Sequence, residues 1–398
     1  MGLVYSFNMK YLRNTSLLSW FNFFYGFQLY SVIAILYFAR VTGSYALGLS
    51  IFSVAKISQA FLEIPTGIYS DKIGRSNCLR IGAIASLLSI VFYSLGQHYI
   101  VLVVGAILEG ACRALFSGNN NALLYETLNE SGQKDKYHEY LGKAHSWLEL
   151  AGFLGAILGG IIAFISYSYL MWISVIPQVI SVAISFQFIE PKMNGHKLDS
   201  IFLHLKEAVA HYKHNVRLRT LSLANILGIG LGESAWSFQS AFYNTVLPIW
   251  AVGFVMSLNY LISTISFRLS GKIINKFKAL NLLIYQEIYS RIMYIVALVY
   301  PTVISPFLMA AASIVYGPGF IAQNTLLQTE FTDKQRATME SINSFLGNCF
   351  YAICAVGLGV LADSLGEARA MLFVQICLIP VVFLYLHAYR TNKNLLFK

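Results

Sequence analysis

Charged side chains are scarce in this chain: Asp, Glu, Lys and Arg together make up 12% of its 398 residues. Soluble domains carry about a quarter of charged residues, so this composition excludes a string of ordinary soluble domains. Hydrophobic residues make up 57% of the chain, and its mean hydropathy is +0.62. Because a membrane-spanning helix needs about 20 apolar residues, the length accommodates about twelve such helices with short loops. The composition therefore predicts an all-α, multi-pass membrane protein.

Paired cysteines and the motifs of common enzymes are also missing from the sequence. The five cysteines are scattered along the apolar stretches, which argues against a disulfide framework or a zinc module. The chain has no glycine-rich phosphate loop before a helix, no nucleophile elbow and no metal-spaced His/Glu set within a span. We therefore expect no enzyme activity, no cofactor and no metal, and an ion gradient as the energy source.

Apolar runs of spanning length recur twelve times, which places both termini on the same side of the membrane. Counted loop by loop, 23 of the 28 Lys and Arg residues lie on that side, against Arg40 and Arg369 on the other. The positive-inside rule then predicts cytoplasmic termini in the cell's inner membrane. This collar of charge also accounts for the net charge of +10 without a nucleic-acid partner. The runs cover residues 16–39, 46–69, 78–97, 99–125, 144–165, 169–189, 219–242, 248–270, 279–300, 303–328, 340–361 and 370–389.

A single sizeable loop, residues 190–218, divides the chain into two halves of six spans. Its apolar residues repeat at helical spacing, which predicts an amphipathic helix on the membrane surface. His204, His211 and His214 can share one side of this helix, but no carboxylate or thiol completes a metal site, so an interfacial linker is the better interpretation. The predicted domains are an N-terminal six-helix half (1–190), the linker (191–218) and a C-terminal six-helix half (219–398).

The two halves match each other in a single register. A single register is what two six-helix repeats predict, with a central cavity and the substrate site between them at mid-membrane. At an offset of 204 positions, Gly67 aligns with Gly271, Asp71 with Asn275, Lys72 with Lys276, Asn120 with Asn324, Glu126 with Glu330 and Gly155 with Gly359.

The segment EIPTGIYSDKIGRSNCL (63–79) follows the second span and carries a spaced motif. Glycines allow a tight turn and close helix approach, and an acid and a base in one loop can lock neighbouring helices by charge-assisted bonds. The segment resembles the signature loop of the major facilitator superfamily, Gly-x-x-x-Asp-Lys/Arg-x-Gly-Arg, which in that family latches the two halves in the outward-facing state. The resemblance implies a secondary transporter that works by alternating access, and Glu63 is expected to pair with a base in or near the loop. The matching residues are Gly67, Asp71, Lys72, Gly74 and Arg75.

Small residues are also spaced along the fifth span. They resemble the family's antiporter-associated motif, Gly-x8-Gly-x3-Gly-Pro-x2-Gly-Gly, and so favour export. Ala151 and Ala156 depart from the motif by replacing a glycine and the proline. Ordinary packing of helices through small residues requires the same glycines and stays an alternative. The matching positions are Gly142, Gly155, Gly159 and Gly160.

Six ionisable side chains fall near mid-membrane, where a charge costs several kcal/mol unless it is paired or faces water. Glu109 and Arg113 stand four residues apart, as do Glu287 and Arg291, so each pair can form within one helix. The family places the fourth span at the central cavity and the ninth at the periphery, so Glu287–Arg291 is interpreted as structural. Glu109–Arg113 remains a candidate for both structure and function. The six are Lys56, Glu109, Arg113, Glu233, Glu287 and Arg291.

Glu233 has no basic residue at helical spacing in its span and is our first candidate for proton coupling, with Glu109 as the second. A partly desolvated carboxylate suits reversible protonation, whereas the structural alternative ties Glu233 to Lys56 across the bundle. The first span carries no acid, which weakens a multidrug interpretation. The candidates that line the substrate cavity are Arg113, Lys56, Asn22, Gln28, Trp236, Gln239, Asn120 and Asn324.

These observations predict a transporter of the major facilitator type that exports a small organic molecule in exchange for protons. Proton-coupled uptake of a nutrient or metabolite is the alternative, in which Arg113 or Lys56 holds an anionic group. A facilitator without a coupling ion and a non-transporting receptor or scaffold on the same fold also stay open. The expected partners are the substrate, protons and membrane lipid, and the protein is expected to be a monomer.

Overall fold

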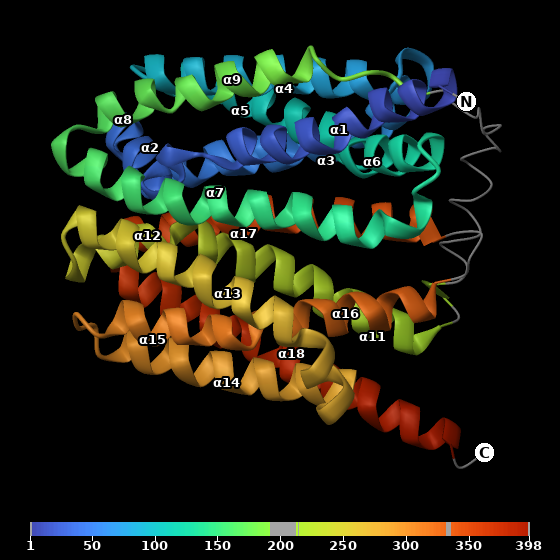
Figure 1. The fold of residues 1–398 in the computed structure, drawn as a ribbon. Helices are drawn as coiled ribbons and strands as arrows, with labels where there is room; N and C mark the ends of the chain where they lie inside the picture. The colour runs from blue at the N-terminus through green and yellow to red at the C-terminus, as the bar shows by residue number, and fades with distance from the viewer. Residues whose placement is uncertain (1, 192–211, 214, 332–335, 397–398) are drawn as a thin grey trace. The chain divides into compact units, whose positions relative to one another are not determined.

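The computed structural model describes residues 2–191, 212–213, 215–331 and 336–396, and every element within these ranges is helical (Figure 1). The three linker histidines and most of the predicted amphipathic helix lie outside the described residues. In the N-terminal half the elements are α1 (Gly2–Gly26), η1 (Leu29–Val32), α2 (Ala34–Thr42), α3 (Tyr45–Ile73), α4 (Arg75–Leu95), α5 (Tyr99–Phe116), α6 (Asn119–Glu130), η2 (Lys134–Lys136), α7 (Tyr137–Ile165), α8 (Tyr167–Ile173) and α9 (Val175–Ser185).

The C-terminal half repeats this succession of helices. Its elements are α11 (Val216–Leu227), η3 (Gly228–Glu233), α12 (Ser234–Val246), α13 (Ile249–Phe277), α14 (Ala279–Val299), α15 (Ser305–Ala311), η4 (Ala312–Ile314), α16 (Tyr316–Glu330), α17 (Arg336–Leu365) and α18 (Glu367–Leu396).

Most of the predicted spans qualify as membrane helices. In the described ranges, nine helices are long and apolar enough to cross a membrane, and eleven spans result when two bent helix pairs count as one each. The first bent pair lies within residues 13–42 and turns by 52°, and the second lies within residues 305–330 and turns by 44°. The remaining predicted span, residues 219–242, runs through α11, η3 and α12. The polar residues of these elements lower its mean hydropathy. The number of twelve therefore stays a prediction.

The chain separates into two compact units. Unit 1 comprises Met1–Thr42, Val54–His196 and Ile249–Ser257, and unit 2 comprises Gly43–Ser53, Lys197–Pro248 and Leu258–Lys398. The first turns of α3 and α13 thus pack with helices from the other half of the sequence. The predicted boundaries at residues 190 and 219 stay a prediction, because this division follows packing rather than chain order.

An acid in unit 2 shows how the first turn of α3 is held there. Asp363, near the end of α17, accepts hydrogen bonds from the backbone N–H groups of Tyr45 (2.7 Å) and Ala46 (3.0 Å). The hydroxyl of Ser44 also donates to the Asp363 carboxylate. The first N–H groups of a helix have no partner within the helix, so a carboxylate at this position satisfies them and complements the helix dipole.

The helix bounds of the two halves correspond at the offset of 204 residues. Helices α3 and α13 both have 29 residues, helices α4 and α14 both have 21, and each pair of helices begins and ends at equivalent positions. The residue between the two helices has a positive φ in both halves, +93° at Gly74 and +61° at Lys278. The helix pairs α1–α7, α1–α9 and α4–α9 pack in unit 1, and their counterparts α11–α17, α11–α18 and α14–α18 pack in unit 2.

The core of unit 1 is aromatic. The Phe21 ring of α1 meets the rings of Phe116 (5.3 Å between centroids) and Phe188 (5.4 Å), both in edge-to-face geometry. Leu79, Cys112 and other apolar side chains surround them. Lipid tails are as apolar as these side chains, so this packing stabilises the unit through van der Waals contact rather than through transfer from water.

Lys278 is the non-glycine residue with a positive φ in the described chain, with φ 61° and ψ 142°. Glycine adopts this backbone region without the Cβ penalty, which is about 1–3 kcal/mol for other residues. We therefore expect Lys278→Gly to raise the stability of the protein by about 1 kcal/mol. The measurement is the apparent unfolding temperature of the purified protein in detergent.

Lys272→Gly is the matched control, because Lys272 is also exposed but lies inside α13. Glycine in a helix interior costs about 1 kcal/mol, so this variant should unfold at a lower temperature than the wild type. A lower unfolding temperature for both variants would show that the Lys278 backbone is not strained.

Candidate functional site

The Glu109–Arg113 pair of α5 is formed within unit 1, as its spacing predicts. Arg113 donates to Glu109 Oε1 from Nε (2.9 Å) and from Nη2 (2.6 Å). The Tyr93 hydroxyl of α4 donates to Glu109 Oε2 at 2.8 Å. The Glu109 side chain is 15% exposed and that of Arg113 is 38% exposed. Both oxygens of the Glu109 carboxylate therefore accept hydrogen bonds from neighbouring side chains.

The second pair, Glu287–Arg291 of α14, lies within unit 2 and has looser geometry. The Arg291 Nε and Glu287 Oε2 atoms are 3.7 Å apart, and both side chains are 15% exposed. The Arg291 guanidinium also donates to the side-chain oxygen of Gln375 in α18 at 2.5 Å. This contact ties α14 to α18, which agrees with the structural role that the sequence suggests.

Glu233 ends a π-helical segment, η3 (Gly228–Glu233), that interrupts the seventh span. Its side chain is exposed, in contrast to the neighbouring Ser234 and Ala235, which are buried. An exposed carboxylate on a membrane helix faces water rather than lipid, because hydrocarbon does not solvate a charge. Single π-helical turns are rare and occur frequently at functional sites.

The residues beside Glu233 divide between exposed and buried positions. Trp236 is 40% exposed and meets the Tyr260 ring edge-on at 6.4 Å. Gln239 is fully buried and donates to the Tyr243 hydroxyl at 2.5 Å. Of the two predicted cavity residues, Trp236 is therefore accessible, whereas Gln239 is part of the interior of unit 2.

Three of the predicted cavity residues lie on interrupted or partly buried helices of unit 1. Gln28 precedes η1, where the first span bends. Lys56 is half-buried in α3. Asn120 is in α6, which follows α5 after a break at Gly118, where φ is +74°.

A cavity of about 80 Å³ in unit 1 brings the predicted residues Asn22 and Asn120 together. The Asn120 side-chain N–H donates to the Asn22 side-chain oxygen at 2.8 Å, which joins α6 to α1. The buried Asn120 Oδ1 atom has no hydrogen-bond partner within the described chain. The cavity is lined by Leu18, Asn22, Tyr25, Phe116, Asn120, Asn121, Leu124, Leu141, Ala144, His145 and Leu148.

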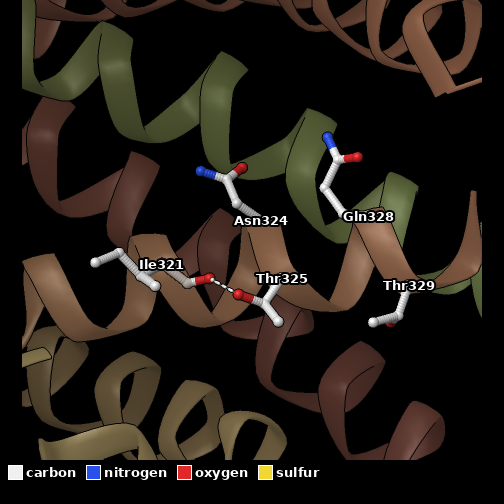
Figure 2. A pocket seen from close by; sticks show the side chains of 5 residues that line it. All are labelled: Ile321, Asn324, Thr325, Gln328 and Thr329. Carbon is white, nitrogen blue, oxygen red and sulfur yellow. Dashed lines mark hydrogen bonds between the residues drawn. The ribbon is translucent and has the colours of Figure 1, made fainter. Parts of the chain in front are cut away.

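Unit 2 presents an equivalent polar face on α16. An open groove of about 520 Å³ runs along Ile321, Asn324, Thr325, Gln328 and Thr329. Figure 2 shows the amides of Asn324 and Gln328 extending toward the same side of the helix, while the Thr325 hydroxyl donates to the Ile321 carbonyl oxygen at 2.8 Å. Beside them, Gln323 donates to the Asn225 side-chain oxygen of α11 at 3.0 Å. This amide pair parallels Asn120–Asn22 in unit 1.

The signature loop is organised around Arg75 and Glu190. The Glu190 carboxylate accepts the backbone N–H groups of Arg75 (2.6 Å) and Ser76 (2.8 Å), so it caps the start of α4. The Arg75 guanidinium contacts Asn119 Oδ1 (3.2 Å) and the Glu126 carboxylate (3.5 Å). A Cβ atom at Gly74 would lie 2.5 Å from the Glu190 carboxyl carbon, so a glycine is required there.

The other predicted latch residues are less constrained. Nothing lies within 4 Å of a Cβ built at Gly67, and Lys72 is exposed. The side chain of Asp71 lies outside the described part of the structure. Glu63 accepts a hydrogen bond from the Ser117 hydroxyl, whereas the sequence suggested a basic partner.

The motif glycines Gly155, Gly159 and Gly160 of α7 differ in how closely they are packed. A Cβ at Gly159 would lie 2.2 Å from the Leu29 carbonyl oxygen, and one at Gly160 would lie 2.8 Å from the Cα of Gly253 in unit 1. A Cβ at Gly155 would be 3.7 Å from its nearest neighbour, an ordinary van der Waals distance. Close helix packing therefore explains Gly159 and Gly160 without reference to transport.

Several important contacts were not found by sequence reasoning. Glu190 gives no local signal, because its partners are more than a hundred positions away. Tyr93 and Asn225 are single polar residues in apolar runs. The π-helical segment has one available signal, the alternating glycines Gly228, Gly230 and Gly232, but such spacing occurs equally in regular packed helices.

Comparison with known proteins yields a family match over most of the chain. The family described as Major Facilitator Superfamily matches residues 16–353. An uncharacterized transporter of Buchnera aphidicola subsp. Schizaphis graminum is 22% identical over 216 residues, which are 54% of this chain and 47% of that protein. The chain thus spans about half the length of the curated relative that it matches.

Three solved structures share the fold along nearly the whole chain. A variant of the nucleoside transporter NupG has a TM-score of 0.81 at 14% identity, covering 94% of this chain and 99% of that one. A bacterial homolog of the human lysosomal transporter Spinster has a TM-score of 0.76 at 15% identity, with 97% of each chain covered. The E. coli fucose:proton symporter FucP has a TM-score of 0.61 at 14% identity, covering 95% and 99%. At these identities the similarity concerns the fold.

The packing of α7 predicts different outcomes for two glycines of the same motif. Gly159→Ala places a methyl group against the Leu29 carbonyl oxygen and should destabilise the protein by about 1–3 kcal/mol. Gly155→Ala, four residues away on the same helix, should not lower the apparent unfolding temperature in detergent and should raise it slightly, because alanine favours the helix. Equal losses in both variants would contradict the assignment of these glycines to helix packing.

The cap on α4 gives a second prediction. Glu190→Ala removes the acceptor of two N–H groups at the helix start and should cost about 1–2 kcal/mol in stability, measured as the apparent unfolding temperature. Glu139→Ala is the control, since Glu139 is an exposed acid in the first turn of α7. A smaller loss for Glu190→Ala than for Glu139→Ala would remove Glu190 from the latch.

Proposed function

The chain belongs to the major facilitator superfamily, and from this premise we propose that it is a secondary transporter that exports a small organic molecule in exchange for protons. Alternating access between two six-helix halves is the mechanism that the family membership supports. We propose the inner membrane as its location, with both termini in the cytoplasm, because the Lys and Arg residues are strongly biased to one side.

The observation that carries proton coupling is the position of Glu233. It is an exposed carboxylate in the membrane part of unit 2, at the end of a π-helical segment. The Glu233 carboxylate is accessible from outside unit 2, whereas the two oxygens of Glu109 already accept bonds from Arg113 and Tyr93. We assign the coupling proton to Glu233 and a supporting role to the Glu109 cluster.

In this proposal, protonation of Glu233 and binding of the substrate oppose each other. Each turnover then moves a proton in one direction and the substrate in the other, as exchange requires. Each of the two binding events then changes the free energy of the other, and the proton and the substrate need not contact the same atoms.

Uptake by symport is the second candidate. It is supported by the tight contacts of Gly159 and Gly160, since packing accounts for the glycines that suggested export. The fucose:proton symporter among the similar structures is consistent with it, although that likeness is one of fold. Symport requires that protonation and substrate binding favour each other, so the sign of the coupling distinguishes the two candidates.

The test measures proton release from the purified protein in weakly buffered detergent when a compound is added. The probes are uridine, L-fucose, dialanine and 5-aminolevulinic acid, whose classes are named for the similar transporters. We expect at least one probe to release protons from the wild type and none to do so from Glu233→Gln. Glu139→Gln, which neutralises an exposed acid of α7, should behave as the wild type.

The direction of the proton signal decides between the candidates. Proton uptake on addition of a probe would establish symport in place of export. Binding that is unchanged in Glu233→Gln, with no proton signal in either protein, would contradict the assignment of Glu233.

A further inference from the structure

The cavity of unit 1 is lined almost entirely by uncharged side chains. Its polar groups are the amides of Asn22, Asn120 and Asn121, the phenol of Tyr25 and the imidazole of His145. No carboxylate, ammonium or guanidinium belongs to the lining of this cavity, within the part of the chain that the structure describes. A charged molecule bound there would lose its hydration without gaining a counter-charge, which is strongly unfavourable.

One polar atom at this cavity lacks the partner that its burial demands. Asn120 uses its N–H to reach Asn22, but its Oδ1 atom is buried and accepts no bond from the described residues. An unsatisfied acceptor of this kind prefers a molecule that brings a hydrogen-bond donor. At about 80 Å³, the cavity admits one hydroxyl- or amide-sized group together with its nearest atoms rather than a whole organic molecule.

The two charged groups of α5, the helix before α6, neutralise each other. Arg113 directs two donors at Glu109 Oε1, and Glu109 directs its second oxygen at Tyr93. An anion that approached Arg113 would also meet the Glu109 carboxylate, and a cation that approached Glu109 would meet the guanidinium. The pair therefore attracts neither sign of charge over any distance.

Unit 2 shows the same chemistry at the equivalent position. Asn324 aligns with Asn120 at the offset of 204, and it lies with Gln328 on the exposed face of α16. The hydroxyls of Thr325 and Thr329 donate to carbonyl oxygens of their own helix, and Gln328 donates to the Glu340 carboxylate at 3.2 Å. The exposed amide of Asn324 prefers water or a polar ligand, because lipid offers neither donor nor acceptor. Both units thus present uncharged hydrogen-bonding groups on the second segment of an interrupted helix.

We propose that the substrate is an uncharged organic molecule rich in hydroxyl or amide groups, of the sugar or nucleoside type, and that it hydrogen-bonds to the amide groups of Asn120 and Asn121 at this cavity. This inference rests on the proposed transport function. It is an alternative to an anionic substrate held by Arg113 or Lys56, because the lining of the unit 1 cavity offers hydrogen bonds rather than charge.

The test is a thermal-shift panel on the purified full-length protein. The uncharged probes are uridine, D-glucose, D-ribose and mannitol, and the charged probes are dialanine, succinate and putrescine. We expect at least one uncharged probe to raise the apparent unfolding temperature of the wild type and no charged probe to do so.

Three variants on α6 locate the effect. Asn120→Ala and Asn121→Ala should weaken the apparent affinity for that probe about tenfold, which corresponds to about 1.4 kcal/mol. Asn121 is exposed, so its substitution should leave folding intact even where Asn120→Ala lowers expression. Asn129→Ala is the control, because Asn129 is an exposed amide of the same helix that does not line the cavity.

Three results would overturn the inference: stabilisation by charged probes alone, stabilisation by no uncharged probe, or stabilisation that both cavity variants retain. Proton release measured on the same samples keeps the two proposals distinct. Proton-linked binding of a charged probe would refute the substrate class while the transport proposal stands. Binding of an uncharged probe without any proton signal would refute proton coupling while the substrate class stands.

Discussion

The cost of an unpaired charge in a membrane interior is the constraint on which the rest of this structure depends. Two of the mid-membrane acids meet it in the same way, with an arginine one helical turn later: Glu109 with Arg113 and Glu287 with Arg291. A pair at this spacing lies within one helix, so it persists when neighbouring helices move. In a protein that must change conformation, charges neutralised within a helix impose no penalty on either state. Glu233 differs, since its side chain is exposed and it ends a π-helical segment, and for that reason we propose it as the coupling residue.

Helix starts impose a second constraint, and carboxylates from distant parts of the chain meet it. Glu190 caps α4 and Asp363 caps α3, each through two backbone N–H groups.

The equivalence of the two halves of the sequence is clearest in the backbone. Helices α3 and α13 have the same bounds at the offset of 204, and Lys278 keeps the positive φ that Gly74 has in the first half. Lys278 thus has a backbone conformation that suits glycine better than lysine, in the turn that sets the direction of the next helix.

Helical runs and helix-internal charge pairs could be predicted from the sequence, because both depend on residues close together in the chain. Eleven of the twelve predicted spans correspond to helices that are long and apolar enough to cross a membrane, when each bent pair is counted as one span. The exception is the span formed by α11, η3 and α12, where polar residues lower the mean hydropathy. The pairing of Asn22 with Asn120 and the Glu190 cap depend on residues about a hundred positions apart, for which one sequence gives no distance information. The first turns of α3 and α13 each pack within the unit that is formed mainly by the other half of the sequence. This could not be predicted either, because hydrophobic periodicity within one segment does not show which distant segments pack against it.

If the substrate is uncharged, as we propose, this constrains how the proposed proton coupling would work. A cationic substrate would compete with a proton for Glu233 by simple electrostatics, whereas a neutral one has no charge with which to displace it. Coupling would then pass through conformation: protonation and substrate binding would have to favour different conformations of one structural element.

The η3 segment is suited to be that element. Gly230 brings it against Phe350 of α17, where any Cβ would collide with the ring, while Gly228 and Gly232 have open space around them. A segment that packs closely at Gly230 but has space at Gly228 and Gly232 has room to change between π-helical and α-helical geometry. Glu233 is the last residue of this segment. Neutralising Glu233 would then alter the balance between windings, and the amide faces would respond through the helices that carry them.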